Sequence, residues 1–295
     1  MTEIIKMQHY VPRVYLRNFS FDQKSNDYAI YCFDKTNSKA FPVNISNIAC
    51  ERFFYDIEND EDQTIEKLLC KYEGAYAGVY NKIIENWNLN CLNSDERTIL
   101  AFFFSIQYLR TKEQRISYRD VFNCVKDRLT QQCSSESLKE DLEACGQESV
   151  LKEGHLTVFM KAVPEMAQKL LTMKWTLCKN TTTMPFWASD NPIVMDNHAE
   201  NKYDRYLGYA CPGIEMYLPL NPQYCLAIFD SAKYHVLPGI METKSIENVI
   251  YNNCLQLMNS TRFIFSNTED FSYAEKFLEK KPEYKSVDRQ RIFPP

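Results

Sequence analysis

The spacing of apolar residues in the first half of the chain constrains the fold most. Beyond Asp62, apolar side chains recur every three or four positions, at Ile65, Leu69, Tyr72, Tyr76, Tyr80, Ile83 and Trp87. Such spacing lines one side of an α-helix, whereas a strand alternates apolar and polar residues. The stripe has to be buried against other elements, so it predicts a long helix packed on a core.

Further helices are expected before Met173. The segment LNSDERTIL begins one of them, with Ser94 as its N-cap, and we expect it to continue to about Leu129, either straight or with a kink. The polar stretch QQCSSESLKEDLEACGQES indicates a connection that contains a short helix. The pattern of HLTVFMKAVPEMAQKLLTM predicts another helix, broken at Pro164 because proline lacks the N–H of a helical hydrogen bond.

Strand patterns dominate the other segments. YAIYCF and AFPVNI, on either side of a polar turn, predict an N-terminal hairpin. After Met173 the strand-like segments are KWTLCKN, PFWASDNPIVM, EMYLPL, YCLAIFD and RFIFS, with helices near METKSIENVIYNNCLQLM and in the charged tail from Glu269. The sequence therefore predicts an α+β fold in one compact domain, residues 1–295: a hairpin and motif segment (1–60), a helical part (61–172) and a mostly β C-terminal half (173–295).

Composition excludes several classes of protein. A net charge of -5 gives no global basic field for nucleic acid, although a local basic cleft is compatible with it. The 7 glycines form no phosphate loop, and the 11 cysteines include no CxxC pair of a zinc ribbon. The start MTEIIKMQHYVPR has no apolar signal-peptide core, and ILAFFFSIQYL is too short to span a bilayer. We therefore expect a cytoplasmic protein with free thiols and no membrane contact.

Polar residues interrupt the apolar face of the second helix. That face is defined by Ile99, Phe102, Phe103, Ile106 and Leu109. Arg110 falls inside it, and Gln107 lies three residues earlier on the same edge. A buried guanidinium needs a carboxylate or an anionic ligand, because burying it unpaired is prohibitive. Glu73, on the flank of the first long helix, is a candidate partner. A structural ion pair and an internal polar site both account for this pattern.

The N-terminal stretch QHYVPRVYLRNFS mixes aromatic residues with titratable and charged groups. Pro12 restricts the residue before it to extended geometry, and a short helix can begin at Arg13. The apolar side chains of that helix would anchor the chain end on the core. His9 and Arg13 are not needed for this anchoring, so they are candidates for a site.

Two other groups of residues are less specific. In FWASDNPIV, an Asp-Asn-Pro corner separates two apolar runs, which favours a turn because Asp and Asn bond to nearby backbone groups. The alternative is a strand end that presents a carboxylate and an amide to a site. His155, His198 and His235 lack metal-ligand spacing, and we treat them as ordinary. No GxSxG elbow or familiar cysteine-nucleophile motif is present.

Taken together, these segments resemble a known family. HYVPRVYLRNF, NIACERFFYD, QYLR, FWASDNPIV and GIEMYLPLNP occur in an order that resembles the bacterial domain-of-unknown-function family DUF4238, marked by its HYVP motif. The resemblance covers nearly the whole chain and departs at Trp187-Ala188, where we expect small or hydroxyl residues. It implies no reaction, but it implies a role in anti-phage defence or as mobile-element cargo. It assigns as motif positions His9, Tyr10, Pro12, Arg13, Gln107, Arg110, Ser189, Asp190, Asn191 and Pro192.

The first functional hypothesis is an effector enzyme, such as a nuclease, acting on phosphates of RNA or nucleotides. His9 would be the general acid or base. Arg13 and Arg110 would clamp an anion. Asp190 would orient His9 or act as a base. This hypothesis expects these four side chains to converge on one open cleft.

Supporting roles fall to neighbouring polar residues. Gln107 and Asn191 would position a water or the substrate, with Tyr10 and Ser189 as further support. No motif requires a cofactor, although Asp190 together with Glu73 could bind Mg²⁺.

The second hypothesis is a non-catalytic sensor or binding module. His9 would then bond to a backbone carbonyl, and the two arginines would bridge Asp190 and Glu73 in a structural network. A third class, a protein-interaction component, follows from the aromatic content of 14%, which leaves room for a homo-oligomer.

Overall fold

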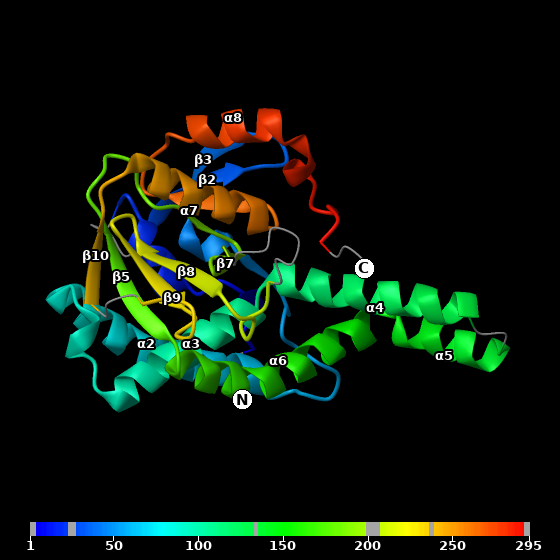
Figure 1. The fold of residues 1–295 in the computed structure, drawn as a ribbon. Helices are drawn as coiled ribbons and strands as arrows, with labels where there is room; N and C mark the ends of the chain where they lie inside the picture. Colours follow the sequence, from blue (N-terminus) through cyan, green and yellow to red (C-terminus); the bar gives the residue numbers. More distant parts are fainter. Residues whose placement is uncertain (1–3, 23–27, 133–134, 199–206, 236–238, 292–295) are drawn as a thin grey trace.

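A five-stranded sheet from the C-terminal half forms the middle layer of the molecule (Figure 1). The computed structural model describes residues 4–22, 28–132, 135–198, 207–235 and 239–291. The strands run in the order β10-β5-β9-β8-β7 and comprise Gly239–Thr243, Lys174–Asn180, Tyr224–Phe229, Ile214–Asn221 and Val194–Asn197. β10 pairs with β5 in parallel, and the other pairs are antiparallel.

Both faces of this sheet are covered, as strand β9 shows. All six of its side chains are buried, so its sequence is a continuous apolar run rather than an alternation with polar residues. Leu226 and Ile228 pack in the main core with helices α2, α3 and α6, which are Thr64–Asn86, Ser94–Leu109 and Glu148–Leu171. The alternate residues Ala227 and Phe229 pack against α7, Ile246–Asn259. Helices therefore lie on opposite sides of the sheet (Figure 1).

A second sheet of four strands lies beside α7. Its order is β3-β2-β11-β6, with bounds Lys39–Asn44, Ala29–Asp34, Phe263–Ser266 and Ala188–Ser189. The predicted N-terminal hairpin is its β2–β3 pair. Helix α8, Ser272–Lys280, packs on this sheet and on α7 through a cluster that includes Phe33, Leu257 and Leu278.

The N-terminal motif segment is anchored as expected. β1, Met7–His9, pairs antiparallel with β4, Cys50–Arg52, and the short helices α1, Arg13–Leu16, and η1, Arg17–Phe19, follow it. Pro12 is the extended N-cap of α1, with φ -69° and ψ 144°. Tyr15, Leu16 and Phe19 are fully buried, so they hold this end of the chain on the core. The 3₁₀ helix η2, Ile45–Asn47, lies between β3 and β4.

The α+β class, the helical middle and the mostly β C-terminal half are confirmed. The apolar stripe of α2 is confirmed from Ile65 to Ile83, but Trp87 is wrong as its last member, because it is the exposed, left-handed C-cap of the helix. The helix expected from Ser94 to about Leu129 is wrong in two respects. Its N-cap is Asn93, which forms a full capping box with Glu96. It also ends at Leu109, and α4, Lys112–Gln132, follows. The hydroxyl of Thr111 accepts a hydrogen bond from the backbone N–H of Gln114, so a new helix is capped there.

Of two further predictions about helices, one is confirmed and one is wrong. The short connecting helix is confirmed as α5, Glu136–Cys145, which extends with α4 away from the rest of the fold (Figure 1). The break at Pro164 is wrong, because α6 continues through it. Pro164 and Met160 are exposed, so water can reach the carbonyl that loses its helical partner. None of the described helices is long and apolar enough to cross a bilayer.

Candidate functional site

Three of the expected site residues line one pocket of about 390 Å³. His9 comes from β1, Arg13 from α1 and Glu73 from α2. Glu66 and Cys70 of α2 line the same pocket. Residues seven and three positions before Glu73 lie on the same face of a helix, which is why α2 presents all three to the pocket. We call this space the His9 pocket.

Arg110 lies beneath this pocket and is almost completely buried. Its Nη1 donates to Oε1 of Glu73 at 2.9 Å, and its Nη2 donates to the carbonyl of His9 at 2.5 Å. Its Nε donates to the hydroxyl of Tyr55 at 3.0 Å. Burial opposes the charged guanidinium, but Tyr55 and Glu73 together raise the pKa of Arg110. Each nitrogen of the guanidinium is thus occupied within the protein, so Arg110 holds the pocket in shape.

Gln107 holds the neighbouring peptide in the same way. Its Nε2 donates to the carbonyl of Tyr10 at 3.1 Å, and the side chain is fully buried. Gln107 lies in the last turn of α3 and Arg110 is its C-cap, so the two side chains hold two successive carbonyls of the HYVP motif. The side-chain oxygen of Gln107 is buried without a hydrogen-bond partner among the described residues.

The imidazole of His9 is held as a neutral base. Its Nε2 lies 3.2 Å from the carbonyl oxygen of Ile45. A carbonyl can only accept, so Nε2 carries the hydrogen and the lone pair is on Nδ1. Burial, assisted by the charges of Arg13 and Arg110, lowers the pKa of His9 to about 4. Near neutral pH this ring is therefore unprotonated, and its Nδ1 lone pair is available as a base.

Glu66 has the opposite perturbation. Burial raises its pKa to about 7, and Glu73 and Asp56 contribute in the same direction against the charge of Arg110. The sequence reasoning missed Glu66, although its seven-residue spacing from Glu73 on a predicted helix was an available signal. Arg13 is exposed, and it forms no ion pair within the described part of the chain. The pocket thus combines a proton acceptor, a proton donor and a guanidinium with free donors.

Asp190 lies elsewhere. It is buried, and its carboxylate accepts hydrogen bonds from the backbone N–H groups of Thr261, Arg262 and Phe263 at 2.8, 2.8 and 3.0 Å. Burial raises the pKa of Asp190, opposed by Lys35 and by these backbone donors. With Tyr10 it lines a second pocket, of about 370 Å³, and not the His9 pocket. The single cleft expected for His9 and Asp190 is therefore divided between two pockets.

The other residues of the SDNP corner are also buried and bonded. The hydroxyl of Thr111 donates to Oδ1 of Asn191 at 2.9 Å, and Nδ2 of Asn191 donates to the carbonyl of Asn259 at 3.0 Å. The hydroxyl of Ser189 donates to Oε1 of Gln256 at 2.6 Å. These contacts are those of a turn held in place by Asx and Ser side chains, as the sequence favoured.

A magnesium site from Asp190 and Glu73 is not formed by this arrangement. The two carboxylates line different pockets, and Glu73 is paired with Arg110. Within the described ranges, no group of three His, Cys, Asp or Glu side chains is arranged to hold a metal ion.

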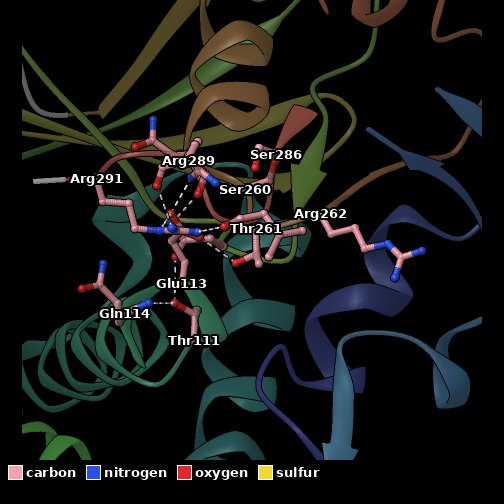
Figure 2. A network of polar contacts seen from close by, with 12 residues as sticks. Thr111, Glu113, Gln114, Ser260, Thr261, Arg262, Ser286, Arg289 and Arg291 are labelled. Carbon is pink, nitrogen blue, oxygen red and sulfur yellow. Dashed lines mark hydrogen bonds and ion pairs between the residues drawn. The ribbon is translucent and has the colours of Figure 1, made fainter. Parts of the chain in front are cut away.

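A buried ionic network around Glu113 holds the C-terminal tail, as Figure 2 shows. Glu113 of α4 accepts from Nη2 of Arg289 at 2.5 Å and from Nε of Arg291 at 2.8 Å. The hydroxyl of Thr261, whose backbone N–H binds Asp190, also donates to Glu113 at 2.8 Å. The sequence reasoning missed this network, since no local pattern relates residues so far apart.

Comparison with known proteins identifies one family. The sequence model of DUF4238, described as a protein of unknown function, matches residues 7–270. No curated protein and no solved structure matches the chain. The matched range includes every motif residue of both pockets and ends before α8 and the two tail arginines.

Proposed function

We propose, for a chain that belongs to the DUF4238 family as its motifs predicted, an enzyme that cleaves phosphate esters of RNA or nucleotides in the His9 pocket. One observation carries the proposal. A single pocket combines a neutral imidazole, a carboxyl group with a pKa of about 7 and an exposed guanidinium. Titratable groups whose environments push their pKa values apart are the usual arrangement of a base and an acid.

The roles follow from these states. Arg13 binds the phosphate and stabilises the negative charge that grows on it. Nδ1 of His9 takes the proton of the attacking hydroxyl, either water or the ribose 2′-hydroxyl. The attacking oxygen forms the new P–O bond, and the leaving oxygen departs with the electrons of the old one. Glu66 gives its proton to that leaving oxygen.

The size and charge of the pocket favour a single-stranded or mononucleotide substrate. A volume of about 390 Å³ lies in the range of small-ligand pockets and accommodates a phosphate with its sugar. The net charge of -5 supplies no extended field for a long duplex. Glu73 is neutralised by Arg110, so it does not repel the substrate as a free carboxylate would.

We also propose that this activity serves anti-phage defence in the cytoplasm. The defence role rests on the resemblance alone, and the location is supported by the ten described cysteines, which are all free. Phage plaque counts on cells that express the protein test the role. Protection should be lost with His9→Ala, and equal plaque counts with and without the wild-type protein would contradict it.

The activity is tested with purified protein incubated with RNA, single-stranded DNA and nucleotides, with and without Mg²⁺. His9→Ala and Arg13→Gln should each lose at least about a hundredfold in rate, the range of general acid–base catalysis. Arg17→Gln is the matched control, since it removes an exposed arginine four residues on that does not line the pocket. Melting temperatures should stay close to the wild-type value for all three variants.

Two results would overturn the proposal. One is that no substrate is cleaved by the wild-type protein. The other is that His9→Ala retains full activity. A large fall in the melting temperature of His9→Ala would instead identify an architectural histidine.

A binding module is the second candidate, and one observation favours it. Several of the expected site residues form hydrogen bonds within the protein, as members of a structural network would: Gln107, Arg110, Asp190 and Asn191. In that case the His9 pocket binds a nucleotide through Arg13 without turnover. Calorimetry would then show nucleotide binding that Arg13→Gln abolishes, with no product formed.

A further inference from the structure

A second concave site lies between the five-stranded sheet and α7, and it shares no residue with the His9 pocket. Its volume is about 540 Å³. Strands β5, β8, β9 and β10 form its floor, and α7 forms one wall. Its lining includes His198, Tyr217, Phe229, Met241, Tyr251 and Asn252. We call it the α7 pocket.

Behind one wall of this pocket lies a buried carboxylate. Glu215 is 5% exposed, and its Oε1 lies 2.9 Å from Nδ1 of His198, a residue that the sequence left as ordinary. The hydroxyl of Tyr234 donates to the same oxygen at 2.5 Å, and the hydroxyl of Tyr217 donates to Oε2. Burial and the charge of Glu215 raise the pKa of both phenols, which keeps them protonated as donors.

A second carboxylate approaches the same imidazole. Oδ2 of Asp196 accepts from the hydroxyl of Tyr251 and lies 3.8 Å from Nε2 of His198. Two carboxylates therefore face one imidazole. Among the described residues no Lys or Arg forms an ion pair with either carboxylate, and none lines the pocket. Even a protonated His198 leaves one negative charge uncompensated.

The walls suit a ligand that is both apolar and positively charged. Tyr217, Phe229 and Tyr251 contribute aromatic rings, whose faces attract ammonium groups. Met241 adds an apolar surface at the rim, where its side chain is exposed. Asn248 and Asn252 of α7 add side-chain amides to the lining.

We propose that the α7 pocket binds a small organic cation, an amine carried on an aromatic or apolar body. The ammonium group lies near the Asp196 and Glu215 carboxylates, and the body packs between α7 and the strands. An anionic ligand of the same shape is rejected, because it would meet uncompensated carboxylates without a cationic partner.

The test uses three probes of one shape and different charge: phenethylamine, the neutral phenethyl alcohol and the anionic 3-phenylpropanoate. Binding is followed by NMR of methionine methyl groups in the full chain, with the Met241 signal assigned from Met241→Leu. Phenethylamine should shift that signal and bind at least about tenfold more tightly than the alcohol, as one favourable charge interaction implies. The carboxylate should show no binding.

Variants locate the interaction. Glu215→Gln should weaken phenethylamine binding about tenfold or more. The control Asp270→Asn removes a carboxylate that is exposed at the start of α8, and it should leave the affinity unchanged. If Glu215→Gln does not fold, Met241→Arg serves instead, since it puts a positive charge at an exposed rim position and should abolish binding. Equal affinity for the amine and the alcohol, or amine binding unaffected by Met241→Arg, would overturn the proposal.

Discussion

Replacing Arg110 with methionine should remove the main polar link between the HYVP segment and the helices. Methionine fills much of the same volume but has no N–H donors. Glu73 would lose its cationic partner, and the hydroxyl of Tyr55 would lose the donor that satisfies it as an acceptor. The carbonyl of His9 would lose the shorter of its two hydrogen bonds, at 2.5 Å from Arg110 against 3.2 Å from Tyr55.

The expected cost is about 3 kcal/mol of unfolding free energy. Removing one partner of a buried ion pair costs about 3–5 kcal/mol, because the other charge is left buried and unpaired. The Glu73 side chain is 24% exposed, whereas that of Arg110 is 2% exposed, so water partly solvates the carboxylate that remains. That exposure places the effect at the low end of the range.

Urea unfolding at neutral pH, followed by tryptophan fluorescence and by circular dichroism, measures this loss where the two transitions coincide. Glu73→Gln keeps a hydrogen-bond acceptor but leaves the buried guanidinium of Arg110 without its counter-charge, so it should also cost about 3 kcal/mol. The double variant should cost less than the sum of the two single variants by about 1 kcal/mol or more. An Arg110→Met cost below about 1 kcal/mol, or strict additivity, would refute the argument. Arg17→Met, at an exposed position, is the control and should change stability by less than about 0.5 kcal/mol.

Three further outcomes are expected. The cleavage rate should rise with pH as His9 deprotonates around its pKa of about 4, and it should fall as Glu66 loses its proton around its pKa of about 7. A pH–rate profile that keeps rising above pH 7 would exclude Glu66 as the general acid. Glu113→Gln leaves the two buried tail arginines without their main counter-charge and should cost about 3 kcal/mol in urea unfolding; an unchanged midpoint would show that the network adds no stability. Pro164→Ala restores an N–H for the Met160 carbonyl and should raise the free energy of unfolding by about 1–3 kcal/mol, measured in urea; an unchanged or lower value would mean that the proline fits α6 without cost.

Sequence patterns predicted which helices and strands form more accurately than they predicted where each one begins and ends. The stripe of α2 follows from its period of three to four residues, and strand β9 from a short continuous apolar run, and both signals depend on near neighbours only. The choice between Asn93 and Ser94 as N-cap depends on which residue keeps an extended backbone before the first helical residue. The capping box between Asn93 and Glu96 decides for Asn93. The end of α3 was missed because Thr111 looks like any helical residue until it caps α4.

The candidate site was predicted in part. His9 and Arg13 line an open pocket together with Glu73, as predicted. Asp190 instead binds the backbone at the start of β11, in another part of the fold. Glu66 was missed, because its raised pKa arises from burial that no local pattern reports.

Local periodicity and motif order were sufficient to establish the α+β class, the buried helices and the family, since each depends on residues close in the chain or on their order along it. Only the tertiary structure decided which polar groups meet. Arg110 and the His9 carbonyl are 101 residues apart, and Thr261 and Glu113 are 148 apart. Contacts over such separations follow from how the sheets and helices pack, and the hydrogen-bonding needs of buried groups then select a single arrangement.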